Sequence, residues 1–190
     1  MGTNCHRKRS EFDTVLVIGA TGVLRPSVRQ LVSHPRSVVA VARSQRKLDQ
    51  LTDDLRSPWL RTLAHDARDP VLPDVLDKLQ HQEQITVTDA LVYGPATTSA
   101  VIERLADRIP GTVVEILTSH AANPAHRERW DARPPVRRTN HRRLLLGWQH
   151  VDGKCQWHDS ARISESSLAM LTGRSDQILG TVTPWSERPK

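Results

Sequence analysis

The sequence predicts an α/β fold of the Rossmann type, a doubly wound parallel sheet covered by helices, and two observations predict it. Short apolar runs rich in β-branched residues alternate with segments of helical periodicity, as expected for parallel strands joined by crossover helices. A glycine-rich turn directly follows the first of these runs, TVLVI at residues 14–18. This combination is typical of a dinucleotide-binding sheet rather than of an all-helical or all-β domain.

The alternation continues through five expected strands, and each has a clear apolar or β-branched signature. The first expected helix places Val23, Leu24, Val28 and Leu31 on one face, with Pro26 in its first turn, where a missing N–H costs little. The expected strands are 14–18, 37–42, 59–64, 89–93 and 112–117, and the later helices are 45–55, 71–79 and 99–109.

The pattern changes after Ser119, where the chain becomes polar, rich in arginine and interrupted by proline. Residues 142–158 are predicted to form a β-hairpin, because Asp152-Gly153 suits a two-residue type I′ turn. A helix over 160–171 and a last strand over 178–182 complete the expected C-terminal portion.

With 190 residues the chain is long enough for one domain with its own core. We expect a flexible basic N-terminus over 1–13 and a single Rossmann-type domain over 14–190, with an arginine-rich loop or lid over 120–141. No apolar run reaches the roughly 18–20 residues that span a bilayer, so no membrane partner and a cytoplasmic location are expected. Cys5 and Cys155 are isolated in the sequence, which predicts neither a disulfide framework nor a metal site.

The net charge of +6 is concentrated in one stretch. Seven arginines lie between Ala125 and Arg143, opposed by Glu128 and Asp131. Such a segment can fold over an anionic ligand or remain a solvated loop, and both interpretations stay open here. Nucleic-acid binding ranks last, because one tyrosine and one phenylalanine supply few stacking surfaces, although five tryptophans are present. Trp130, within the loop, is a candidate for stacking on a flat heterocyclic substrate.

The turn after the first expected strand reads Gly19-Ala-Thr-Gly22 and leads into a helix. One glycine lets the chain turn tightly, and a second lets the backbone approach a pyrophosphate without a Cβ clash. Free N–H groups at the start of the next helix then attract the anion. We therefore expect a dinucleotide site formed by Gly19, Thr21, Gly22, Val23 and Leu24, and the alternative is an ordinary strand–helix turn.

The end of the second expected strand predicts which dinucleotide is preferred. A site for NAD usually has a carboxylate there that accepts the ribose 2′-OH. This chain instead has Arg43, Ser44, Arg46 and Lys47, and the first carboxylate is Asp49. Positive charge at a helix start opposes the helix dipole, which a bound 2′-phosphate would explain. The expected cofactor is NADPH or NADP+, held by Arg43, Ser44 and Arg46, and a solvated basic helix start is the alternative.

Three segments make the chain similar to the short-chain dehydrogenases/reductases: VIGATG, HDARD at residues 65–69, and the fifth expected strand ending in Ser119. The resemblance implies that Asp66 contacts the adenine, that Gly94 follows the strand beside the cofactor, and that Ser119 polarises a substrate carbonyl. The C-terminal portion looks like a compact bacterial branch of that superfamily. The protein as a whole also resembles unusual short-chain reductases of nucleoside-antibiotic biosynthesis, such as the one acting on the 8-keto precursor of pentostatin.

The sequence departs from that family at its proton donor. Ordinary members have a Tyr-x-x-x-Lys pair about a dozen residues beyond the serine. Here Tyr93 is the single tyrosine and lies on the fourth expected strand, and no lysine occurs between Lys78 and Lys154. The candidate catalytic residues are therefore Ser119 for the carbonyl, then His120 as a proton donor, with Tyr93 as a displaced donor or a packing residue. His141 is a weaker candidate than His120.

Two functional interpretations are open. One is an NADPH-dependent ketoreductase that transfers hydride to a small carbonyl substrate, heterocyclic or nucleoside-like. The other is a non-catalytic NADP(H)-binding regulator that senses the redox state of the cofactor. The retained Ser119 favours the first, and the missing Tyr–Lys pair favours the second. Self-association into a homo-oligomer is left open.

Overall fold

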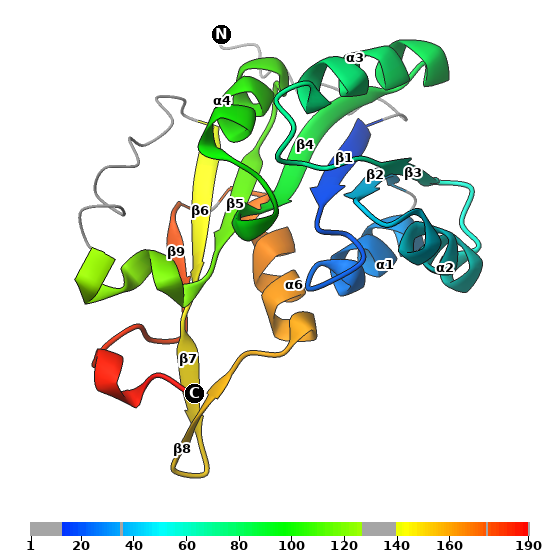
Figure 1. Ribbon diagram of the computed structural model, residues 1–190. Coiled ribbons are helices and arrows are strands. Elements are labelled where there is room, and N and C mark those ends of the chain that lie inside the picture. Colours follow the sequence, from blue (N-terminus) through cyan, green and yellow to red (C-terminus); the bar gives the residue numbers. More distant parts are fainter. Residues whose placement is uncertain (1–12, 35, 127–139, 174, 190) are drawn as a thin grey trace, which may run out of the picture.

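Parallel strands form the centre of the computed structural model, which describes residues 13–34, 36–126, 140–173 and 175–189 (Figure 1). Within these residues the main sheet has seven strands, all paired in parallel, so the predicted Rossmann-type fold is confirmed. In their order across the sheet they are β3 (Leu60–Ala64), β2 (Ser37–Ala42), β1 (Asp13–Ile18), β4 (Thr86–Tyr93), β5 (Val113–Leu117), β6 (His141–Leu146) and β9 (Gln177–Leu179).

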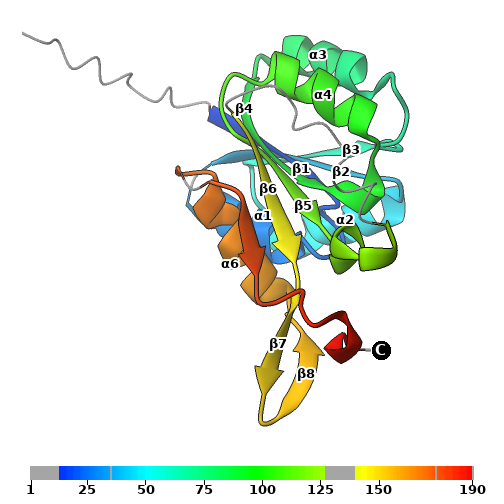
Figure 2. The same ribbon diagram turned by 90° about the vertical axis from the view of Figure 1, so that its left-hand side faces the viewer.

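Helices cover both faces of this sheet, as Figures 1 and 2 show. One face packs against α1 (Arg25–Ser33), α2 (Gln45–Leu55) and α6 (Ser160–Met170). The other packs against α3 (Leu72–Glu83) and α4 (Ser99–Arg108). Short 3-10 turns complete the described chain: η1 (Gly94–Ala96), η2 (Ser119–Ala122), η3 (Pro124–His126) and η4 (Trp185–Glu187). Among the described helices, none is long and apolar enough to cross a membrane.

The central strands are buried on both sides, which explains their continuous apolar sequences. On β1, Val15 and Val17 face the layer of α1, α2 and α6, whereas Leu16 and Ile18 face the layer of α3 and α4. None of these four side chains is more than 1% exposed. The period of two along the strand therefore fills two separate cores from one short run.

Polar residues fix where the helices begin. Ser44, Thr98 and Asp159 are the N-caps of α2, α4 and α6, and each side chain accepts a hydrogen bond from a backbone N–H in the first turn. The shortest of these hydrogen bonds is accepted by the Asp159 carboxylate, 2.7 Å from the backbone nitrogen of Arg162. By contrast, α1 begins after Leu24 with no side-chain cap, so its N-terminal N–H groups have no side-chain acceptor at the cap position.

The predicted hairpin over 142–158 is only partly correct. Its turn is confirmed, since Asp152 and Gly153 both have positive φ, at 50° and 73°, as a type I′ turn requires. Its arms are shorter than expected, because only β7 (Trp148–Val151) and β8 (Lys154–Trp157) pair antiparallel. The preceding residues, His141–Leu146, instead form β6 of the main sheet.

Gly147 separates β6 from the hairpin. A Cβ at this position would lie 2.0 Å from the Thr181 carbonyl oxygen, so only glycine allows the two backbones to approach this closely. The last strand ends early for a related reason. β9 stops at Leu179 because Gly180 has φ of +80°, and Thr181 forms an isolated bridge with Trp148.

Two of the seven arginines in the basic stretch lie on a strand, beyond the loop expected over 120–141. Arg142 and Arg143 lie in β6, where the Arg142 guanidinium donates to the Met170 carbonyl and Arg143 Nε lies 3.3 Å from Asp176 Oδ2. His141 is also part of β6, beside the first residue of β5, with Nε2 3.4 Å from Glu115 Oε2. A role for His141 as a proton donor remains a prediction. The remainder of that loop, 127–139 with Trp130, and residues 1–12 lie outside the described chain.

Candidate functional site

The glycine-rich turn lies against the end of β4. Gly19 follows β1 directly and has φ of +92°, and its N–H donates to the Val41 carbonyl at 3.2 Å. A Cβ on Gly19 would lie 2.9 Å from the Tyr93 Cβ, so glycine is required both by the backbone angle and by the space. The turn then closes through the Gly22 N–H, which lies 3.1 Å from the Gly19 carbonyl oxygen. These contacts direct the chain from β1 into α1 at the carboxyl ends of the strands.

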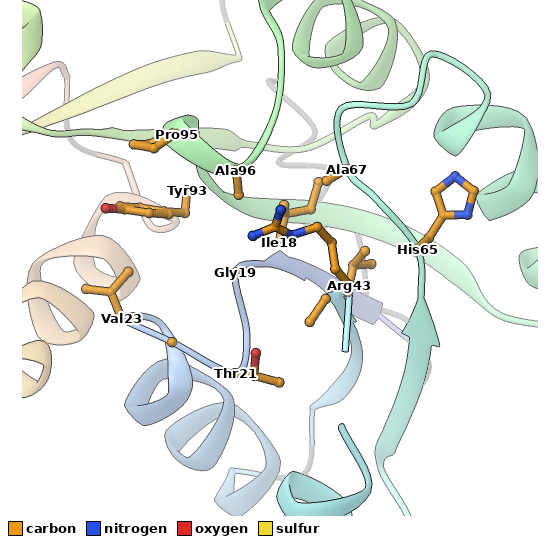
Figure 3. Close-up of a pocket in the computed structure, with 13 residues that line it drawn as sticks. Ile18, Gly19, Thr21, Val23, Arg43, His65, Ala67, Tyr93, Pro95 and Ala96 are labelled. Carbon is orange, nitrogen blue, oxygen red and sulfur yellow. The ribbon is translucent and has the colours of Figure 1, made fainter. Parts of the chain in front are cut away.

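A pocket of about 250 Å³ opens at these carboxyl ends (Figure 3). In the strand order of this sheet, β1 lies between β2 and β4, and the connections on its two sides lead to opposite faces. Ligands of open α/β sheets bind at this reversal of strand order. The walls of the pocket come from the ends of β1, β2, β3 and β4 and the residues that follow them. In that order the lining residues are Ile18, Gly19, Thr21, Gly22 and Val23; Val41, Ala42 and Arg43; His65 and Ala67; Tyr93, Pro95 and Ala96.

The pocket is positively charged at its rim. Arg43 and His65 are the ionisable bases among its lining residues, and none of those residues is acidic. Figure 3 shows the guanidinium of Arg43 over the pocket rather than turned away from it. The uncapped start of α1 adds partial positive charge from backbone N–H groups on the opposite side. The arrangement is suited to an elongated anionic ligand.

Two loops at the pocket edge are tied together. The Thr97 hydroxyl donates to the Ala67 carbonyl at 2.6 Å, and Arg68 donates to the Pro95 carbonyl at 3.3 Å. These bonds join the segment after β3 to the segment after β4 without using the pocket's own lining side chains. Asp66 is exposed next to this junction, and its carboxylate accepts the Arg68 N–H at 3.0 Å.

Tyr93 ends β4 and forms one wall of the pocket. Its ring is half-buried against the core that includes α1 and α6, and Figure 3 shows its hydroxyl pointing away from Arg43. Burial raises the pKa of the Tyr93 phenol above its ordinary value of about 10. The phenol therefore stays protonated at neutral pH.

Ser119 lies beyond the end of β5, at the start of η2. Its side chain is buried, and its hydroxyl oxygen accepts a hydrogen bond from Arg188 Nε at 3.3 Å. Because a guanidinium can only donate, the Ser119 oxygen must accept in this pair, which leaves the hydroxyl proton available for another acceptor. His120, the next residue, is exposed.

Aromatic rings hold Arg188 in place. Its guanidinium carbon lies 5.0 Å from the Trp157 ring centroid and 5.4 Å from that of Trp185, within the range of cation–π attraction. Trp148 supports both rings through edge-to-face contacts, with centroids 6.2 Å from Trp157 and 6.0 Å from Trp185. The hairpin and the C-terminal tail, which lie outside the Rossmann sheet, thus position the Arg188 guanidinium beside Ser119.

The structure brings together only part of the predicted site. Five predicted cofactor residues (Gly19, Thr21, Gly22, Val23 and Arg43) line one pocket with Tyr93. The other predicted residues lie outside its lining: Leu24 is fully buried in the core, Ser44 caps α2, Arg46 and Asp66 are exposed, Gly94 is buried beside Leu117, and Ser119 and His120 follow β5. Roles for these residues remain predictions.

Two residues of the site were missed in the sequence. His65 follows β3 directly, as Arg43 follows β2, so the same rule about strand ends would have identified it. Its Nε2 lies 3.3 Å from Asp69 Oδ2. Arg188 is different, because it lies 69 residues from Ser119 and no local pattern marks it.

Among solved structures, many short-chain dehydrogenases and reductases are similar to this chain. A short-chain dehydrogenase from Bacillus anthracis str. 'Ames Ancestor' matches 90% of this chain and 95% of its own, with 10% identity and a TM-score of 0.68. YwfH, an NADPH-dependent reductase involved in bacilysin biosynthesis, matches 90% and 98%, with 12% identity and a TM-score of 0.63. Yeast methylglyoxal/isovaleraldehyde reductase Gre2, complexed with NADPH, matches 88% and 75%, with 15% identity and a TM-score of 0.60.

The chain has their fold. No protein-family model and no curated protein matches the sequence. The likeness therefore shows the arrangement of the sheet and its helices, and the activity has to be argued from this chain's own site.

The raised pKa of Tyr93 can be measured directly, because the chain has one tyrosine. In a spectrophotometric titration of tyrosinate absorbance, we expect a midpoint above about 10, since burial penalises the charged phenolate. Unfolding in denaturant should return the midpoint to about 10. Tyr93→Phe should remove the signal, and a folded-state midpoint at or below 10 would contradict the burial described here.

Proposed function

We propose that this protein is an NADPH-dependent ketoreductase of an atypical short-chain type, acting on a carbonyl group of a small substrate. The observation that carries the proposal is the pocket at the strand ends, which combines the Gly19–Gly22 turn with Arg43 and includes no carboxylate among its lining residues. A heterocyclic or nucleoside-like substrate, and a place in antibiotic biosynthesis, belong to the same proposal. The NADPH dependence of YwfH and the NADPH bound to Gre2 support the choice of cofactor.

We expect a dinucleotide to contact positive charge at two places in the pocket. Gly22 adds no side chain to the wall, and even a Cβ there would meet only the Gly19 carbonyl oxygen at 3.7 Å. The space above it is thus open to a pyrophosphate, facing the uncapped N-terminus of α1. Arg43 would bind the 2′-phosphate at the other end, with Ser44 and Arg46 next to it in the chain. Bound in this way, the cofactor supplies the hydride.

Ser119 and Arg188 would supply the polarity that a carbonyl reduction needs. With its oxygen held by Arg188, the Ser119 hydroxyl donates its proton toward a substrate carbonyl. That hydrogen bond from Ser119 strengthens as negative charge develops on the carbonyl oxygen in the transition state. Arg188 acts through Ser119 in this scheme and is a positioning residue.

A proton must still reach the reduced oxygen. The buried phenol of Tyr93 is a weak acid, and in the described residues no lysine side chain lines its pocket to lower its pKa. His120 is exposed beside Ser119, and an imidazole is the side chain that most often acts as a general acid, so His120 is the preferred donor.

A second function, redox sensing without catalysis, is favoured by one feature. The Tyr-x-x-x-Lys pair of ordinary short-chain enzymes is missing from the sequence. A regulator would bind NADPH and NADP+ with different affinities and turn over neither. Incubation of the purified protein with NADPH and a panel of cyclic ketones separates the two. Consumption of NADPH that depends on a ketone supports the reductase, and its absence throughout the panel supports the regulator.

The turn provides a test of cofactor binding that leaves the fold intact. Gly22→Val should weaken NADPH by at least about tenfold, because its side chain occupies space that the pyrophosphate needs. The melting temperature should change little, since the backbone at Gly22 is not left-handed and a Cβ meets no close neighbour. Calorimetry measures the affinity, and wild-type affinity in Gly22→Val would contradict a dinucleotide site on this turn.

Arg43 provides a test of cofactor preference. Arg43→Ala should weaken NADPH by roughly tenfold or more, because a charge-assisted contact is worth about 1.5–3 kcal/mol, and should leave NADH nearly unchanged. Arg46→Ala is the matched control, since Arg46 is exposed outside the pocket lining and should have a smaller effect. Equal losses for the two cofactors would show that Arg43 does not bind the 2′-phosphate.

Substitutions of the proposed catalytic residues should lower kcat to different extents, most for Ser119, less for His120 and least for Tyr93. Ser119→Ala should lower kcat by about 10²–10³, the usual effect of removing one oxyanion donor. His120→Gln should cost less, and Tyr93→Phe should retain substantial activity. Arg188→Lys should lower kcat in the wild-type background but add little to Ser119→Ala, because Arg188 acts through the serine. An inactive Tyr93→Phe with an active Ser119→Ala would reverse the assignment.

A further inference from the structure

We infer that the hairpin and the C-terminal tail form a metal site of the zinc class from His150, Cys155 and Glu187, separate from the dinucleotide pocket. One potential ligand atom from each of these residues lies within 4.8 Å of the other two. The three residues come from β7, β8 and η4, so a bound ion would join the tail to the hairpin. The sequence predicted no metal site, because its cysteines are isolated and the ligands become neighbours only in the fold.

The hairpin prearranges two of the ligands. His150 and Cys155 are directly opposite each other in the antiparallel register, and so are Trp148 and Trp157. Directly opposed residues share a face, and alternation along β7 places His150 on the same face as Trp148. One face of the hairpin therefore presents two aromatic rings and, next to them, an imidazole and a thiol.

The tail adds the third ligand to that face. Trp185 packs edge-on against Trp148, and two residues later the Glu187 carboxylate reaches His150, with Oε2 2.9 Å from Nε2. An ion pair between His150 and Glu187 would account for that contact. It would not account for the Cys155 thiol beside the two side chains. Glu187 is followed by Arg188, whose position over Trp157 and Trp185 fixes the tail on both sides of the carboxylate.

The donor set selects the metal. Thiolate, imidazole and carboxylate are the usual ligands of Zn²⁺, at bond lengths of about 2.0–2.3 Å, whereas Ca²⁺ and Mg²⁺ prefer oxygen alone. A tetrahedral ion would need its ligand atoms roughly 3.3–3.8 Å apart. The present separations are at most 4.8 Å, and exposed side chains such as His150 and Glu187 can close the difference by rotation. Three protein ligands leave a fourth position for water.

The site would add a further link between the hairpin and the tail. β7 and β8 form a two-stranded sheet of their own, and an isolated hairpin is marginally stable in water. Figures 1 and 2 show this hairpin extending away from the body, with the tail beside it. A metal clip is a common way to stabilise such a small unit. Because Arg188 follows Glu187, the ion would also hold the arginine that reaches Ser119.

Binding of Co²⁺, and then of Zn²⁺, to the purified full chain tests the inference. Co²⁺ should bind with a stoichiometry of one and give a sulfur-to-cobalt charge-transfer absorption, which Zn²⁺ should displace. Cys155→Ser should abolish that absorption. His150→Gln and Glu187→Gln should each weaken Zn²⁺ by at least about tenfold. Affinity should rise with pH, because the thiol and imidazole must lose their protons.

Matched controls separate this site from other histidines and cysteines of the chain. Cys5→Ser, His34→Gln and Glu165→Gln should leave stoichiometry and affinity unchanged. Hydrogen exchange should slow at the amides of residues 185–188 when Zn²⁺ binds the wild-type protein, and not when it is added to Cys155→Ser. The inference is overturned by the absence of saturable binding, or by binding that follows Cys5 instead of Cys155. Neither result depends on whether the protein reduces ketones.

Discussion

The close approach of Gly19 to Tyr93 is the constraint on which the site depends. Because the glycine has no side chain and a positive φ, β1 can end directly against the last residue of β4 and still turn into α1. That contact places the start of α1, the end of β2 and the end of β4 around one pocket. A bulkier residue would push the turn off β4 and separate the phosphate-binding elements from the strand end beside which a substrate would lie.

Most of the Rossmann sheet could be predicted because its information is local. Runs such as Thr14–Ile18 and Ser37–Ala42 are buried on both faces, so their composition alone indicates a parallel strand. The C-terminal third was harder, because its pairings are set by contacts that are distant in sequence. Residues 142–146 resemble a hairpin arm, and only the contact between Gly147 and Thr181 shows that the strand ends there and the hairpin begins.

The same distinction applies to the site, where some residues are marked by their local sequence and others only by contacts with distant residues. Arg43 was predictable because a residue that follows a parallel strand lies at the edge where ligands bind. Arg188 was not, since its position depends on three tryptophan rings from two segments. The missing Tyr–Lys pair left the proton unassigned in the sequence. The structure shows which cation accompanies Ser119 in the absence of that pair.

The ends of the sheet affect how the protein behaves at high concentration. An exposed edge strand can pair with the edge of another molecule and begin aggregation. Here the β9 edge has three residues, and it is cut off by the left-handed backbone of Gly180. Ile178 is 55% exposed on this strand, so a longer β9 would present an adhesive apolar edge. Its shortness leaves a neighbouring chain few backbone groups to pair with at this edge.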